Sequence, residues 1–312
     1  MPAFSTHYIF LEEMQKPIEE KFDFKLNSKV AGVGTQGPDI FIFHRIWPPF
    51  TIYKSLMGVS STLHHGKTDK LFEAFAEYLK KSENEEVAKS YIYGFILHYA
   101  LDRNCHPYVY AFQDQITSEN KKIHPLAAHN QVEHAIDTYL LYHRDGIYPP
   151  SLFNPDETFT KELSEEEEIA NVLNYAILNA HGKDVDKNEI IRAINDTASI
   201  QKTLSNKNGN ALKLAHILET PFGPIDGYFK LSASIKPNDL DIADKYANVR
   251  YKEWASPYDK IPRHDSFEEL FEKAKPDALN LIDGFNKICK GEKTGYEVTG
   301  NISFTTGMEV KD

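Results

Sequence analysis

The feature that most constrains this chain is the stretch YIYGFILHYALDRNCHPYVY at residues 91–110. Its apolar residues cover nearly every face of a predicted helix, so we expect that helix to be buried. His98, Asp102 and His106 nevertheless recur every four residues, which places them along one stripe of the helix. A carboxylate in such a segment is costly unless it is paired or bound to a cation. The stretch therefore indicates one wall of a buried polar or metal-binding site.

A second predicted helix, at residues 125–144, repeats the arrangement. His129 and Glu133 are four residues apart, and Asp137 extends the same stripe, where we expect it to orient a ligand histidine. Two helices that each present such a pair can hold metal between them, and zinc accepts both imidazole nitrogen and carboxylate oxygen. A single pair is more often a plain hydrogen bond. Two pairs with His106 between them favour a metal site.

Helical periodicity dominates the rest of the chain, so the predicted fold class is all-α, a multi-helix bundle with a C-terminal elaboration. We expect a metal-binding catalytic domain at residues 1–220 and an extension at 221–312 packed on the same domain. Further helices are expected at residues 5–14, 69–81, 85–111, 164 onward, 187–206, 207–219 and 266–288. Because proline disrupts helices, the helix at 85–111 is expected to end near Pro107, and that at 266–288 to break at Pro276.

Composition excludes some classes of function. The net charge of −11 disfavours binding to long nucleic acid. No stretch is apolar enough for a transmembrane segment, the N-terminus has no basic start typical of a signal peptide, and two cysteines cannot build a disulfide framework. These features together predict a cytoplasmic protein.

Six motifs that contain potential metal ligands follow one another along residues 1–145. They are His7 in an early helix, GTQGPD with Asp39, LHHGKT with His64 or His65, HYALD with His98 and Asp102, a His-Pro with His106, and HNQVE with His129 and Glu133. This ordered series resembles the bacterial zinc-dependent phospholipases C, whose helical fold is shared by the S1/P1-type nucleases. Secreted members begin, after processing, with a tryptophan, whereas this chain begins Met-Pro-Ala.

The resemblance implies zinc as cofactor, two or three ions, and a ligand set for each. One ion would be held by Asp39, His64 (or His65), His98 and Asp102. A second would be held by His106, His129 and Glu133. A third would use His7, with Asp102 as a bridge.

The implied activity is phosphoester hydrolysis of the phospholipase C type, with a metal-bound water as nucleophile and Asp39 as ligand and catalytic base. Three carboxylates beside two or three divalent ions leave about one to three positive charges, which suit a small-molecule or lipid phosphoester. Trp47 and Phe50 form a candidate rim for lipid. Two alternatives stay open: an S1/P1-like nuclease or nucleotidase, and a non-catalytic protein with a structural metal site. The oligomeric state is also left open.

Overall fold

The computed structural model describes residues 3–46, 54–205, 215 and 231–310. The regular secondary structure of this part is almost all helix, with two short strands, which confirms the all-α fold class. The predicted rim residues Trp47 and Phe50 and most of the predicted helix at 207–219 lie outside the described residues.

The chain divides into two compact units, each discontinuous in sequence. Unit 1 comprises Met1–Ile9, Asn104–Pro155 and Gln201–Lys273, and unit 2 comprises Phe10–Arg103, Asp156–Ile200 and Ala274–Asp312. The helices α1 (Phe4–Phe22), α5 (Glu85–Glu119), α8 (Lys187–Leu204) and α11 (Phe267–Cys289) each contribute residues to both units. The predicted boundary near residue 220 stays a prediction.

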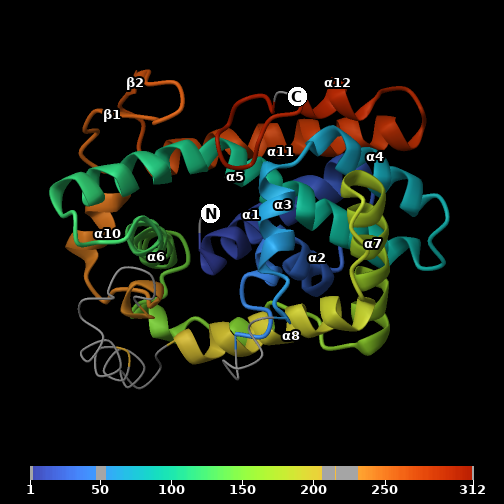
Figure 1. Cartoon of the computed structure of the whole chain (residues 1–312), viewed down its shortest axis with the longest axis horizontal. Helices are drawn as coiled ribbons and strands as arrows, with labels where there is room; N and C mark the ends of the chain where they lie inside the picture. The colour runs from blue at the N-terminus through green and yellow to red at the C-terminus, as the bar shows by residue number, and fades with distance from the viewer. Residues whose placement is uncertain (1–2, 47–53, 206–214, 216–230, 311–312) are drawn as a thin grey trace. The chain divides into compact units, whose positions relative to one another are not determined.

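Unit 2 packs short helices around the first part of α5. It holds α2 (Ser28–Gly34), η1 (Gly37–Phe41), α3 (Met57–His65), α4 (Thr68–Leu79), α7 (Leu163–His181) and α12 (Gly295–Thr299). Within this unit α4 packs against both α7 and α12, and α3 packs against η1 (Figure 1).

A close approach of backbones in unit 2 joins α2 to α5 through glycines. A Cβ at Gly94 would lie 2.3 Å from the Ala31 carbonyl oxygen, and a Cβ at Gly34 would lie 2.3 Å from the Tyr91 carbonyl oxygen. Only glycine fits such a contact. The contact fixes the end of α2, with its C-cap Thr35, beside the buried middle of α5.

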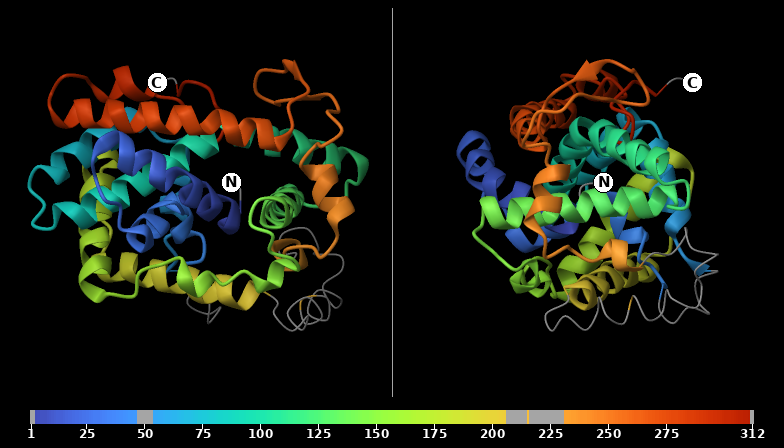
Figure 2. Two further views of the ribbon diagram at one scale, coloured as in Figure 1. Left: turned by 180° about the vertical axis from the view of Figure 1, so that it is seen from behind. Right: turned by 90° about the vertical axis from the view of Figure 1, so that its left-hand side faces the viewer.

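Unit 1 is built on α6 (Pro125–His143), which packs against α10 (Leu240–Tyr246), η6 (Leu231–Ser234) and η3 (Pro150–Leu152). The turn η4 (Pro155–Glu157) follows η3 at the end of this segment. A hairpin of two short antiparallel strands, β1 (Trp254–Ala255) and β2 (Pro262–Arg263), follows α10. Both views in Figure 2 show this hairpin as a loop beside the second half of α5.

Two expectations about prolines were wrong. Helix α5 continues through Pro107 to Glu119, and α11 continues through Pro276 to Cys289. A proline inside a helix costs about 3 kcal/mol, but apolar residues beyond each proline are buried, among them Val109 and Phe112 in α5. Their burial offsets the cost, because tertiary packing supplies most helix stability in proteins. Among the described helices, none combines the length and apolar character needed to cross a bilayer.

Candidate metal site

The polar stripe of α5 meets two other elements in unit 2. His98 and Asp102 come from α5, His64 from the last turn of α3, and Asp39 from η1. We call these four residues the α3–α5 cluster. All four are buried, and His98 and Asp102 have no exposed surface. Three segments that are distant in sequence thus bring together four side chains of the types that can bind metal.

The spacing of the ligand atoms in this cluster fits one zinc ion. His64 Nε2 lies 3.3 Å from Asp39 Oδ1 and 3.7 Å from Asp102 Oδ2, and His98 Nε2 lies 3.1 Å from Asp102 Oδ2. Atoms bound at about 2.0–2.2 Å to a tetrahedral zinc lie roughly 3.3–3.6 Å from one another. Asp39 Oδ1 is also buried without a hydrogen bond among the described residues, which fits a role as a metal ligand.

Both imidazoles of the cluster are oriented by hydrogen bonds at their outer nitrogens. His98 Nδ1 lies 2.9 Å from the Thr35 carbonyl oxygen, and His64 Nδ1 lies 2.8 Å from the Ser60 carbonyl oxygen. A carbonyl oxygen only accepts, so each Nδ1 donates to it, and Nε2 is the ring nitrogen that faces the cluster. This is the usual outer contact of a metal-binding histidine.

Burial and mutual charge shift the pKa values of two residues in the α3–α5 cluster. Burial raises the pKa of Asp39 to about 6, against the opposing charges of His98 and His64, and the neighbouring Asp102 adds to the rise. Burial disfavours the charged form of His98, but the charge and hydrogen bond of Asp102 outweigh it and raise the His98 pKa. A divalent cation bound between Asp39 and Asp102 would offset the cost of burying their charge.

Two uncharged residues form the walls of this cluster. Phe304, from the C-terminal tail, packs its ring 5.5 Å from that of His64 and 6.0 Å from that of His98. Gly37 has a φ of +50°, and a Cβ there would lie 2.4 Å from the His98 ring. Gly37 lies within the GTQGPD motif that predicted Asp39 as a ligand, but its own role was not foreseen. Phe304 was not foreseen at all, because nothing in the local pattern around it points to the cluster.

The two adjacent histidines of α3 have different environments. His64 is buried in the cluster, whereas His65 is exposed and turns its Nδ1 to the Ser61 carbonyl oxygen 2.9 Å away. Neighbouring helix residues point about 100° apart, so only one of the two can face the site. The geometry therefore favours His64 as the candidate ligand.

A second group of candidate ligands lies within unit 1, between α5 and α6. His106, His129 and Glu133 offer ligand atoms within 4.8 Å of one another, and we call them the α5–α6 cluster. His129 Nε2 lies 2.8 Å from Glu133 Oε1. All three residues are largely buried. Two imidazoles and a carboxylate are a ligand set that zinc accepts, and catalytic zinc sites often have three protein ligands.

Two residues beside the α5–α6 cluster were missed by sequence reasoning. Gln113 places its Oε1 3.0 Å from His129 Nδ1, so it orients that imidazole as the carbonyl of Thr35 orients His98. Tyr110 packs its ring 4.9 Å from that of His129 and 5.8 Å from that of His106. One hint of their role was present in the sequence, namely helical spacing: Tyr110 follows His106 by four residues and Gln113 follows it by seven.

The expectation that Asp137 orients a ligand histidine was wrong. Its carboxylate accepts hydrogen bonds from the Ser5 and Thr6 backbone amides at 3.1 and 2.8 Å and from the Thr6 hydroxyl at 2.7 Å. Lys236 Nζ lies 3.3 Å from the same carboxylate. Asp137 therefore satisfies the free amides at the start of α1 and stabilises the end at which partial positive charge accumulates.

His7 lies one turn into α1 and is buried. It belongs to unit 1, whereas its expected partner Asp102 belongs to unit 2. The third metal site therefore stays a prediction.

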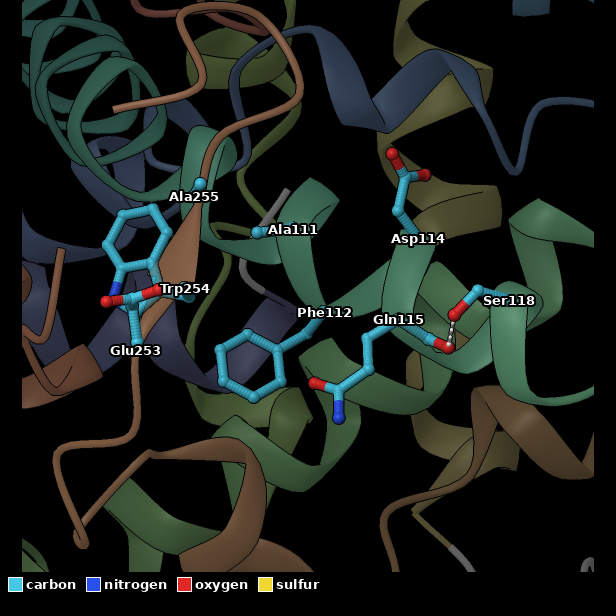
Figure 3. A pocket seen from close by; sticks show the side chains of 8 residues that line it. All are labelled: Ala111, Phe112, Asp114, Gln115, Ser118, Glu253, Trp254 and Ala255. Carbon is cyan, nitrogen blue, oxygen red and sulfur yellow. Dashed lines mark hydrogen bonds between the residues drawn. The ribbon is translucent and has the colours of Figure 1, made fainter. Parts of the chain in front are cut away.

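A surface pocket of about 390 Å³ lies in unit 1 between the second half of α5 and β1 (Figure 3). Its lining includes Phe112, Asp114, Glu253 and Trp254, and none of the candidate ligands. This pocket is therefore distinct from both clusters.

Comparison with known families adds an independent finding. Residues 6–208 match the protein family described as zinc dependent phospholipase C. The matched segment contains every candidate ligand from His7 to Glu133. No curated protein and no solved structure matches the chain.

Proposed function

The chain belongs to the zinc-dependent phospholipase C family, and on that premise we propose that it is a zinc-dependent phosphodiesterase that cleaves small-molecule or lipid phosphoesters. The observation that carries the proposal is the convergence of Asp39, His64, His98 and Asp102 at distances suited to one zinc ion. His106, His129 and Glu133 would hold a second ion.

Zinc, when bound, supplies an acidified water as nucleophile and stabilises negative charge on the phosphoryl group. The chain's own residues prepare for that chemistry. The carbonyl oxygens of Thr35, Ser60 and Gln113 accept from Nδ1 of His98, His64 and His129. Each of these rings therefore turns its Nε2 towards a cluster. Preorganisation of this kind reduces the reorganisation required during the reaction.

Asp39 is the proposed ligand and general base. A carboxylate can accept a proton from a neighbouring water, and Asp39 is buried beside the other residues of the α3–α5 cluster. Its Oδ1 faces the cluster, 3.3 Å from His64 Nε2. In this role it would accept the proton of the attacking water while its carboxylate is held among buried neighbours.

Metal content and hydrolysis, measured together, test the proposal. Asp102→Asn keeps the shape of the side chain but removes the charge that faces His64 and His98. We expect this variant to hold less zinc than the wild type and to hydrolyse a generic aryl phosphodiester about a hundredfold more slowly or worse. Metal content is read by elemental analysis and activity by release of the aryl alcohol.

His143→Ala is the matched control, because His143 lies at the exposed end of α6, where it forms a surface pair with Asp244 and packs on the rings of Tyr139 and Tyr142. It should keep both metal and activity. Wild-type zinc content in Asp102→Asn would overturn the ligand assignment. Full metal content in the wild type without hydrolysis of phosphodiesters would leave a structural metal site, and selective hydrolysis of 3′-nucleotides would favour the nuclease-like alternative.

A further inference from the structure

Exposed apolar side chains gather on the hairpin segment of unit 1. Tyr251 and Ile261 are each 55% exposed, and Val249 and Tyr258 are also exposed. All four fall within residues 249–261, around the short strands β1 and β2. Isolated exposed apolar residues are common, but a concentration on one projecting loop marks an interaction surface.

The hairpin is a rigid element rather than a loose loop. Trp254 is buried beneath it, donates from Nε1 to the Asp265 carbonyl oxygen at 3.0 Å, and meets the Tyr108 ring edge-on at 5.1 Å. The Asn248 side chain donates to the carbonyls of Lys252 and Asp265 at 2.9 and 3.1 Å. The apolar side chains are therefore presented outward by a fixed backbone, which lowers the entropic cost of binding.

The charge of this segment is opposite to that of the chain. Residues 249–264 contain four Lys or Arg and two Asp or Glu, whereas the whole chain carries −11. Arg263 holds Asp259 through two hydrogen bonds of 2.9 and 2.6 Å, and Glu253 lines the pocket between β1 and α5 (Figure 3). Arg250, Lys252 and Lys260 remain exposed, and none forms an ion pair within the described ranges.

The hairpin is also next to the α5–α6 cluster. Tyr258 packs its ring 5.5 Å from that of Tyr110, edge to face. Tyr110 in turn contacts the rings of His106 and His129. A partner bound at the hairpin would thus be separated from the candidate metal ligands His106 and His129 by one aromatic side chain, that of Tyr110.

We propose that residues 249–264 form a docking surface for an anionic phospholipid bilayer, with Tyr251, Tyr258 and Ile261 inserted at the interface. Tyrosine suits this depth because its ring is apolar and its hydroxyl remains hydrated. Arg250, Lys252 and Lys260 would contact lipid phosphates. Each of these cations would add to the binding free energy near the membrane surface, although the chain as a whole is acidic. The inference rests on the proposed function, since a docked hairpin would bring phosphoester headgroups close to the α5–α6 cluster.

A second copy of the chain is the competing occupant. The surface favours lipid, because apolar and cationic side chains alternate on it, as in peripheral membrane-binding segments. A copy of the same acidic chain would have to present a complementary acidic patch to a surface only one short hairpin wide. The experiment below separates the two.

Sedimentation of the full chain with vesicles tests the docking surface. We expect the wild type to bind vesicles that contain phosphatidylglycerol more tightly than vesicles of phosphatidylcholine alone. Tyr251→Ser/Ile261→Ser should weaken binding at least about tenfold, and Lys252→Ala roughly fivefold. Leu163→Ser is the matched control, because Leu163 is 59% exposed on α7 and should leave binding unchanged.

Two further readouts separate this proposal from the function itself. Vesicle binding should persist in EDTA, and the double variant should hydrolyse a water-soluble aryl phosphodiester like the wild type while losing activity on vesicles. Hairpin-dependent binding without any hydrolysis would support the docking surface and overturn the proposed function. Wild-type vesicle binding by the double variant would overturn the docking surface. So would a dimer in light scattering that the double variant abolishes, because the hairpin would then serve self-association.

Discussion

At the scale of single residues, the hydrogen bond at Nδ1 of each candidate histidine ligand determines how its ring is oriented. His64 and His98 each present Nε2 inward because a carbonyl oxygen accepts from Nδ1. His129 is oriented in the same way by Gln113. A neutral imidazole has one donor and one acceptor nitrogen, so a single outer hydrogen bond determines which nitrogen can bind metal.

The adjacent histidines of α3 provide a matched pair for a residue-scale prediction. His64→Gln should reduce the zinc content by about one ion per chain, because it removes a buried donor from the α3–α5 cluster. His65→Gln should retain full zinc content, since His65 is exposed and contacts only its own helix. Elemental analysis of the two purified variants distinguishes them. Equal loss in both, or a greater loss in His65→Gln, would contradict the assignment.

At the scale of elements, the separation of α2 and α5 controls where ligands lie. Their backbones approach at Gly94, and the end of α2 carries Thr35, whose carbonyl holds His98. The α3–α5 cluster thus depends on helix packing as well as on its own side chains.

Gly94→Ala is expected to disturb that packing. The added methyl group would lie 2.3 Å from the Ala31 carbonyl oxygen, which is backbone and cannot move aside alone. We expect a loss of about 1–3 kcal/mol in the free energy of unfolding together with weaker zinc binding. Urea unfolding and zinc titration measure the two effects. Gly58→Ala is the control, because a Cβ at Gly58 meets nothing within 4 Å. A Gly94→Ala variant with wild-type stability would show that α2 can move without cost.

A second element-scale contact joins the segment after η1 to α8. His44 Nδ1 accepts from the Leu56 amide at 2.9 Å, so the ring is neutral and Nε2 lies 2.8 Å from Glu189 as donor. Burial lowers the His44 pKa below its usual value. The hydrogen bond from Arg45, together with its charge, lowers the Glu189 pKa to about 2, although partial burial opposes this.

This contact predicts how stability changes with pH. Between pH 4.5 and about 2 the unfolded chain binds a proton at Glu189 that the folded chain does not, so acid lowers the stability of the folded state. Glu189→Gln should therefore have a lower free energy of unfolding than the wild type at pH 7, by about 1 kcal/mol for the partly exposed Arg45–Glu189 pair. This difference in stability should decrease towards pH 2. Unfolding curves at several pH values measure it. Glu20→Gln, at an exposed i,i+4 pair, should show no such trend. A gap that widens with acid would refute the prediction.

At the scale of the whole molecule, buried charge links folding to metal. Asp39, Asp102 and Glu133 are buried carboxyl groups, and each unit contains a cluster that pairs carboxylate with imidazole. Buried charges are costly without a partner. The metal-free chain is therefore expected to be the less stable form.

Removal of metal should lower the thermal unfolding temperature. A ligand that binds only the folded state stabilises it by about 2.7 kcal/mol at a free concentration of 100 times its dissociation constant, and each filled site adds its own term. We expect EDTA to abolish this stabilisation and added zinc to restore it, as measured by calorimetry. Asp102→Asn should respond less to EDTA than the wild type. An unfolding temperature unchanged by EDTA in a zinc-loaded sample would contradict the expectation.

The amino-acid sequence by itself determined the part of the candidate site that depends only on the periodicity of the α-helix. His98 and Asp102, and His129 and Glu133, share a stripe because four residues make about one turn, whatever surrounds them. The ordered series of motifs pointed to the family, and helical periodicity to the fold class.

Only the tertiary structure decided the rest, because each remaining choice depends on contacts between distant segments. Thr35 and His98 are 63 positions apart, and Phe304 reaches His64 from the other end of the chain. Packing, and not the local sequence pattern, buries His64 while His65 stays exposed. Packing also places Asp137 where it accepts hydrogen bonds from the amides at the start of α1. Pro107 and Pro276 stay inside helices for the same reason: burial of side chains beyond them outweighs the lost hydrogen bond.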